Sequence, residues 1–184
     1  MRQVRAARKS VTKMSAPRKR PTPRQSPEPR LVLGIGNLLL KDEGVGVHVV
    51  SAIEAQVAAG DFVLPEGVEV CDGGTLGMDL LDLIEDRRKV IVIDAVETDA
   101  APATVLRFTA EDLARRQAAD LSLHQVGLFE ALAMARQLGC APDEVVIFGI
   151  VPKDMSPGLE LSAEVAAVVP EVIRMVLAEI GGRE

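Results

Sequence analysis

Short apolar runs alternate with segments of helical period along this chain, and that alternation restricts its fold more than any other feature. Four apolar runs are typical of buried strands and lie at residues 31–36, 68–72, 89–96 and 144–150. Apolar residues recur every three or four positions between them, which indicates amphipathic helices from Asp42 and over 76–85, 125–138 and 162–180. Strands alternating with helices predict an α/β, three-layer sandwich with a mostly parallel sheet.

A fifth, weaker run at residues 103–108 follows the strand at 89–96 too closely for a helical crossover. We therefore expect it to pair antiparallel at an edge, which would make the sheet mixed. A polar helix is expected over residues 110–118. Pro170 lies inside the last helix and is expected to kink or split it.

The net charge of −6 hides two unlike parts of the chain. Residues 1–30 hold ten Lys or Arg and one acid, so they carry +9 and the rest carries −15. Few large apolar side chains occur in this first part, so residues 1–30 are expected to be a disordered tail before one domain at 31–184. Met14 is an alternative translation start. An acidic domain disfavours nucleic-acid binding, and no apolar run approaches the roughly 18 residues of a membrane span.

Two cysteines, Cys71 and Cys140, give no disulfide framework, which suits a reducing compartment, and a cytoplasmic location is expected. We interpret Cys71, on a predicted strand, as a small packing residue. The alternative is the nucleophile of a cysteine hydrolase, which would need a nearby base and a lowered pKa.

Glu43, Asp94 and His124 each follow a predicted strand. The carboxyl ends of parallel strands meet at one edge of an α/β sheet, where ligands bind. Glu, Asp and His form a plausible ligand set for a borderline divalent metal, so the three are expected to converge on one ion. Plainer interpretations remain: Glu43 suits a helix dipole and His124 can cap a helix. His48, in the middle of a helix, is given no role.

Two neighbouring features complete the predicted site. Asp72, Gly73 and Gly74 form a loop at a strand end that is expected to be a wall of the same cleft, because paired glycines permit an unusual backbone shape. Asp42 is the expected cap of the helix that follows it. The turn after the first strand lacks the third small residue of a dinucleotide fingerprint, so a nucleotide site is rejected.

Five short motifs, in order, resemble those of the hydrogenase maturation endopeptidases. They are GIGN at 34–37 with DEGVG at 42–46, DGGTLG at 72–77, IDA at 93–95, SLHQVGL at 122–128 and GIVP at 149–152. Each motif is weak alone, and the five in sequence are specific. The similarity covers about residues 31–180.

This resemblance implies a twisted, mostly parallel five-stranded sheet and a peptidase that trims the C-terminal extension of a nickel-iron hydrogenase large-subunit precursor. Glu43, Asp94 and His124 match the metal-site residues of the family. Nickel would be supplied by the substrate, with no organic cofactor. The protein is expected to act as a monomer on this protein partner, without nucleic acid or membrane.

The resemblance leaves the chemistry open. In one mechanism the metal only positions the scissile bond; in another, Glu43 or Asp94 also activates water as a general base. A nickel-binding chaperone or checkpoint protein without peptidase activity would use the same three residues to hold metal.

Overall fold

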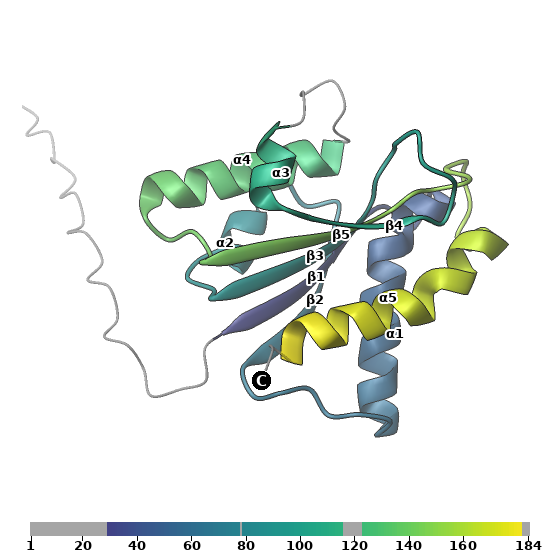
Figure 1. Ribbon diagram of the computed structural model, residues 1–184, viewed down its shortest axis with the longest axis horizontal. Coiled ribbons are helices and arrows are strands. Elements are labelled where there is room, and N and C mark those ends of the chain that lie inside the picture. The colour runs from purple at the N-terminus through teal and green to yellow at the C-terminus, as the bar shows by residue number, and fades with distance from the viewer. Residues whose placement is uncertain (1–28, 78, 116–122, 182–184) are drawn as a thin grey trace, which may run out of the picture.

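A computed structural model describes residues 29–77, 79–115 and 123–181 (Figure 1). It contains one five-stranded sheet with the strand order β2-β1-β3-β5-β4. The strands are β1 (Arg30–Ile35), β2 (Val68–Gly74), β3 (Lys89–Ala95), β4 (Val105–Thr109) and β5 (Glu144–Ile150). The predicted α/β class with a mostly parallel sheet is confirmed.

Four of the strands run parallel, and β4 alone pairs antiparallel, with β5. The prediction that the strand after β3 pairs antiparallel at an edge of the sheet is thus confirmed. Because β1, β2, β3 and β5 are parallel, their carboxyl ends lie at one edge of the sheet, which we call the carboxyl edge. The amino ends of these strands lie at the opposite side of the sheet, which we call the amino end.

Two pairs of helices cover the sheet, one pair on each face (Figure 1). One face holds α1 (Val45–Ala59) and α5 (Ala163–Gly181), and the other holds α2 (Leu80–Ile84) and α4 (Leu123–Leu138). The alternation of strand side chains divides the aliphatic core accordingly. Val32 and Ile91 pack with α1 and α5, whereas Leu33 and Val92 pack with α2 and α4. A 3-10 helix, η1 (Lys41–Gly44), precedes α1, and α3 (Ala110–Arg115) follows β4.

Several element ends differ from the expectation by a few residues; for example, the helix expected over 76–85 is α2, Leu80–Ile84. Two further differences concern Pro170 and Arg30. Pro170 does not split α5, which is one continuous helix; its ring is exposed, so the carbonyl that it leaves without a helical donor can face water. Strand β1 begins at Arg30, which pairs with Val68 and Lys89. The Arg30 guanidinium also donates to the Ile180 carbonyl, so this residue belongs to the domain. Residues 1–28 of the predicted disordered tail lie outside the described residues. The end of the polar helix expected over 110–118 lies outside them too.

Within the described part of the chain, no helix is both long enough and apolar enough to cross a bilayer.

Candidate functional site at the carboxyl edge

The chain leaves β1 through a turn that sets η1 directly on the carboxyl edge. Gly36 has φ of 140°, and a Cβ there would lie 2.0 Å from the Glu43 carbonyl oxygen. A Cβ at Gly46 would lie 2.2 Å from the Ile93 carbonyl oxygen. Only glycine permits either approach. Glu43 is therefore held over the end of β1, next to the end of β3.

Asp94 is the penultimate residue of β3, and only 1% of it is exposed. It pairs with Gly149 of β5 in the ladder. Since alternate strand residues share a face, its side chain lies on the face of Val92, which α2 and α4 cover. The expected burial of this carboxylate is confirmed. Burying an acid is costly, so its retention here favours a specific role.

His124 is the second residue of α4, and its side chain lies outside the described residues. The position of its helix is nonetheless defined. A Cβ at Gly127 would lie 3.0 Å from the Cα of Gly77, in the loop that follows β2. Leu128, one residue on, is in the core beneath. The amino-terminal part of α4, at Gly127, thus lies against the loop that leaves β2 at the carboxyl edge.

Asp72, Gly73 and Gly74 end β2 at this edge. The Asp72 side chain is exposed and accepts a hydrogen bond of 2.7 Å from the Gly74 amide. Gly74 has φ of 47°, and Gly73 is buried against Leu33. The unusual backbone shape expected from the paired glycines is present. That this loop walls the cleft stays a prediction.

The fold therefore brings the three predicted positions, and this loop, to the same edge of the sheet. No group of three His, Cys, Asp or Glu side chains close enough to hold a metal occurs among the side chains that the structure describes, which do not include that of His124. Convergence of Glu43, Asp94 and His124 on one ion stays a prediction.

Asp42 has a structural role that its sequence position did not indicate. It is fully buried, and its carboxylate accepts hydrogen bonds from the Lys153 amide (2.9 Å), the Asp154 amide (2.9 Å), and the Ser162 amide (2.7 Å) and hydroxyl (2.8 Å). The expectation that it caps the following helix is wrong, because neither η1 nor α1 has a side-chain cap. Burial raises the pKa of the Asp42 carboxyl, but the four donors outweigh this, and its pKa is lowered.

The segment around Asp42 is tied to the loop of residues 152–162 by further contacts. Lys41 pairs with Asp154 at 2.5 Å, and its amide donates to the Gly158 carbonyl at 3.0 Å. Lys41 has φ of 45°, a conformation that is costly for a residue with a side chain. Such a conformation persists only where its surroundings enforce it, and it lies two residues before Glu43.

A small pocket of about 160 Å³ lies at the same edge, between the loops that follow β3 and β5. Its lining residues are Glu97, Thr98, Val151, Pro152, Lys153 and Met155. Glu97 is three residues beyond Asp94, and the Lys153 amide is one of the donors to Asp42. This pocket therefore adjoins the predicted site.

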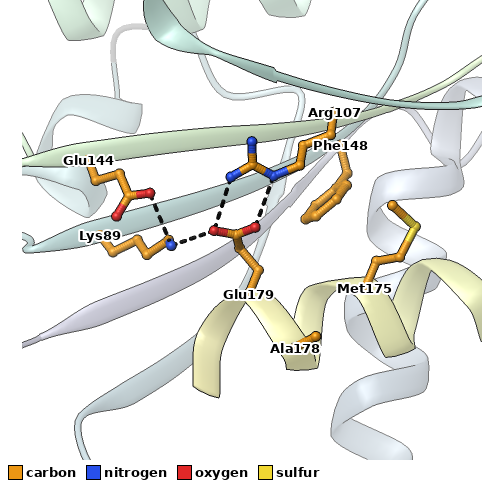
Figure 2. A pocket seen from close by; sticks show the side chains of 7 residues that line it. All are labelled: Lys89, Arg107, Glu144, Phe148, Met175, Ala178 and Glu179. Atoms are coloured by element: carbon orange, nitrogen blue, oxygen red, sulfur yellow. Dashed lines mark hydrogen bonds and ion pairs between the residues drawn. The ribbon is translucent and has the colours of Figure 1, made fainter. Parts of the chain in front are cut away.

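A larger cavity, of about 840 Å³, lies towards the amino end (Figure 2). Its charged side chains bind one another: Lys89 contacts Glu179 at 2.5 Å and Glu144 at 3.1 Å, and Arg107 donates to both oxygens of Glu179 at 2.9 and 3.2 Å. The bond from Arg107, despite the cost of burial and with help from Lys89, lowers the pKa of Glu179 to about 2. We do not place the site here, because these charges already neutralise each other.

The contacts of Cys71 agree with the packing role that its sequence context indicated. Burial raises the pKa of the Cys71 thiol, and the carboxylates of Glu69 and Asp72 raise it further. A reactive cysteine needs the opposite, a lowered pKa. The His48 Nε2 atom is buried without a hydrogen-bond partner among the described residues.

A mixed, mostly parallel sheet with acidic residues at its carboxyl edge places this protein among the three-layer α/β proteins that bind their ligands at that edge. Comparison with known proteins narrows the class. The family model described as hydrogenase maturation protease matches residues 47–179. The chain therefore belongs to the hydrogenase maturation protease family, whose members are peptidases.

Individual relatives agree with this assignment. The chain is 35% identical over 151 residues to the hydrogenase 2 maturation protease of Escherichia coli, covering 82% of this chain and 89% of the relative. The solved structure of the hydrogenase maturating endopeptidase HybD from Escherichia coli matches with a TM-score of 0.75 at 34% identity, over 83% of this chain and 92% of that one. The [NiFe] hydrogenase maturation protease HybD from Thermococcus kodakarensis matches with a TM-score of 0.66 at 27% identity, over 83% and 99%.

Proposed function

We propose that this protein is the endopeptidase that removes the C-terminal extension of a nickel-iron hydrogenase large-subunit precursor after nickel has been inserted. The observation that carries the proposal is the buried Asp94 at the end of β3, beside the segment that holds Glu43. Family membership supplies the reaction class. The expected cytoplasmic location, monomeric state, and lack of nucleic-acid and membrane partners are part of the same proposal.

In this proposal the nickel ion belongs to the substrate, and Glu43, Asp94 and His124 are the side chains that would contact it. Two carboxylates and an imidazole suit a borderline divalent ion and leave positions for ligands from the substrate. Recognition of the metal would then report that the precursor has been loaded. The immediate role of the three residues is to hold the substrate with its scissile bond at the carboxyl edge.

Hydrolysis requires water to attack the scissile carbonyl carbon, a proton to leave that water, and a proton to reach the departing amide nitrogen. In one mechanism the three residues only position the bond. In the other, Glu43 or Asp94 accepts the proton of the attacking water and returns it to the leaving nitrogen.

The test is to offer the purified protein two forms of the precursor, nickel-loaded and metal-free, and to follow the mass of the large subunit. We expect loss of the C-terminal extension only from the loaded form. Equal cleavage of both forms would remove metal recognition from the mechanism. Binding of the loaded precursor with no change in its mass would instead support the nickel-binding chaperone or checkpoint protein.

A further inference from the structure

Exposed leucines gather at the carboxyl edge. Eight large apolar side chains are exposed among the described residues, and four of them are on loops at this edge: Leu38, Leu39, Leu76 and Leu159. Single exposed leucines are ordinary, but a group beside a candidate site indicates an interaction surface. Leu39 and Leu159 are the most exposed of the four, at 65% each.

Three of these residues form one patch on two adjoining segments. Gly158 bridges to Leu40, and its amide donates to the Leu39 carbonyl at 2.9 Å. Leu39 and Leu159 are therefore each one residue from the same bridge. Leu38 completes what we call the leucine patch, Leu38, Leu39 and Leu159.

The leucine patch adjoins the predicted site. A Cβ at Gly44 would lie 3.0 Å from the Leu38 Cα and 3.2 Å from its Cδ2 atom, so Leu38 packs over the residue that follows Glu43. A polypeptide bound at Glu43 would therefore lie within reach of the patch.

The backbone fixes the leucines in their exposed positions. The Leu39 amide donates to the Asn37 side chain at 3.0 Å, which holds the turn. The four hydrogen bonds to Asp42 lock the second segment onto the first. The buried Asp42 carboxylate thus helps to hold these leucine side chains in water. Their exposure costs free energy unless a partner covers them.

Resting on the proposed function, we propose that the leucine patch binds apolar side chains of the substrate protein next to the cleaved bond. Three leucines are too small an area for a stable dimer, which buries about 800 Å² on each partner. An acidic domain would also be repelled by anionic lipid surfaces. The patch has an apolar centre, and the Lys41–Asp154 ion pair lies beside it, which is the composition of a protein-binding surface.

The test is the double variant Leu39→Ser/Leu159→Ser, with Leu138→Ser as the matched control. Leu138 is 63% exposed and ends α4 at the other end of the sheet. The probe is the nickel-loaded large-subunit precursor encoded by the same genome. Binding is measured by biolayer interferometry, cleavage by the mass of the product, and folding by thermal denaturation.

We expect the double variant to weaken binding and to raise KM about tenfold or more, with kcat changed little and the thermal midpoint retained. The control should match the wild type. An unchanged affinity and kcat/KM in the double variant would overturn the proposal, as would an equal loss in Leu138→Ser. So would a dimer of the wild type that the double variant abolishes.

Failure of the proposed function has a different signature. If the wild type binds the precursor but leaves its mass unchanged, the peptidase assignment fails, while the ratio of the two affinities still decides the role of the patch. If the wild type does not bind the precursor at all, both proposals are overturned.

Discussion

Each end of the sheet holds a carboxylate away from water, fully at Asp42 and partly at Glu179, and the two are satisfied in different ways. At the carboxyl edge, Asp42 is held chiefly by backbone amides of the loop at 152–162. At the amino end, Glu179 is held by the side chains of Lys89 and Arg107 (Figure 2). Amides carry no net charge and cannot move without moving the chain, whereas side chains can rearrange and do cancel the charge.

The bonds to Asp42 position the backbone of the predicted site, whereas the ion pairs of Glu179 only hold the fold together. The amides around Asp42 fix the backbone directly before Glu43 and leave the charge of the Asp42 carboxylate uncancelled. The cluster around Glu179 joins α5 to three strands and neutralises itself. Cavity size alone would therefore place the functional site at the amino end of the sheet. The buried carboxylates of Asp42 and Asp94 instead favour the carboxyl edge.

The largest effect should come from the predicted metal-contacting residues. Asp94→Asn, Glu43→Gln and His124→Ala should each lower processing of the nickel-loaded precursor by about 100-fold or more, in the range of lost acid–base or positioning groups. Their thermal midpoints should stay near that of the wild type. His48→Ala is the control and should process normally. Full activity in Asp94→Asn would remove the site from the carboxyl edge.

Asp42→Ala should be the most destabilising of the substitutions at these two ends. It leaves three buried amides and a hydroxyl without their acceptor, which costs about 3 kcal/mol of unfolding free energy. Urea denaturation measures this. Asp154→Ala removes a partly exposed carboxylate that pairs with Lys41 and accepts from the Ser156 amide, and it serves as the control. A small loss in Asp42→Ala would show that the loop holds its position without the buried charge.

Glu179→Gln should destabilise the protein in a pH-dependent way. The pKa of Glu179 falls from its ordinary 4.5 to about 2. A lowered pKa contributes stability that is present above pH 4.5 and is lost as pH falls towards 2. With Arg107 nearly half exposed, we discount the effect for solvent screening to about 2 kcal/mol at neutral pH. Denaturation of wild type and variant should converge at low pH; a constant difference would contradict this account.

Cys71→Ala should have the smallest effect. The side chain is half-buried on β2 and packs at the edge of the core formed with α2 and α4. Removing one sulfur from this position should cost less than about 1.5 kcal/mol and should retain processing. Loss of processing in a folded variant would revive the cysteine hydrolase.

Local patterns in the sequence were enough to predict most of the fold. The aliphatic strands β1, β3 and β5 could be predicted because the sheet buries them on both faces, and β4 because too few residues separate it from β3. Pro170 broke no helix because its side of α5 faces solvent. Arg30 was assigned to the tail because the backbone partners of its strand position lie far along the chain.

The candidate site was only partly predictable. Strand ends placed Glu43, Asp72 and Asp94 at one edge, since parallel strands share that direction. The role of Asp42 could not be read, because its donors come from residues 111 to 120 positions away. Likewise the leucines at 38, 39 and 159 look like core residues in the sequence, and only the bridge at Gly158 shows that they meet in solvent.

The long reach of the Asp42 hydrogen bonds has a consequence for how the enzyme is made. A nascent chain that has passed Glu43 has no donor for the buried acid beside it until residues 153–162 have left the ribosome. Arg30, at the start of β1, meets its partner at Ile180 still later. The carboxyl edge, which holds the predicted peptidase residues, is thus completed only after residues 153–162 have been made, and the start of β1 only after Ile180 has been made.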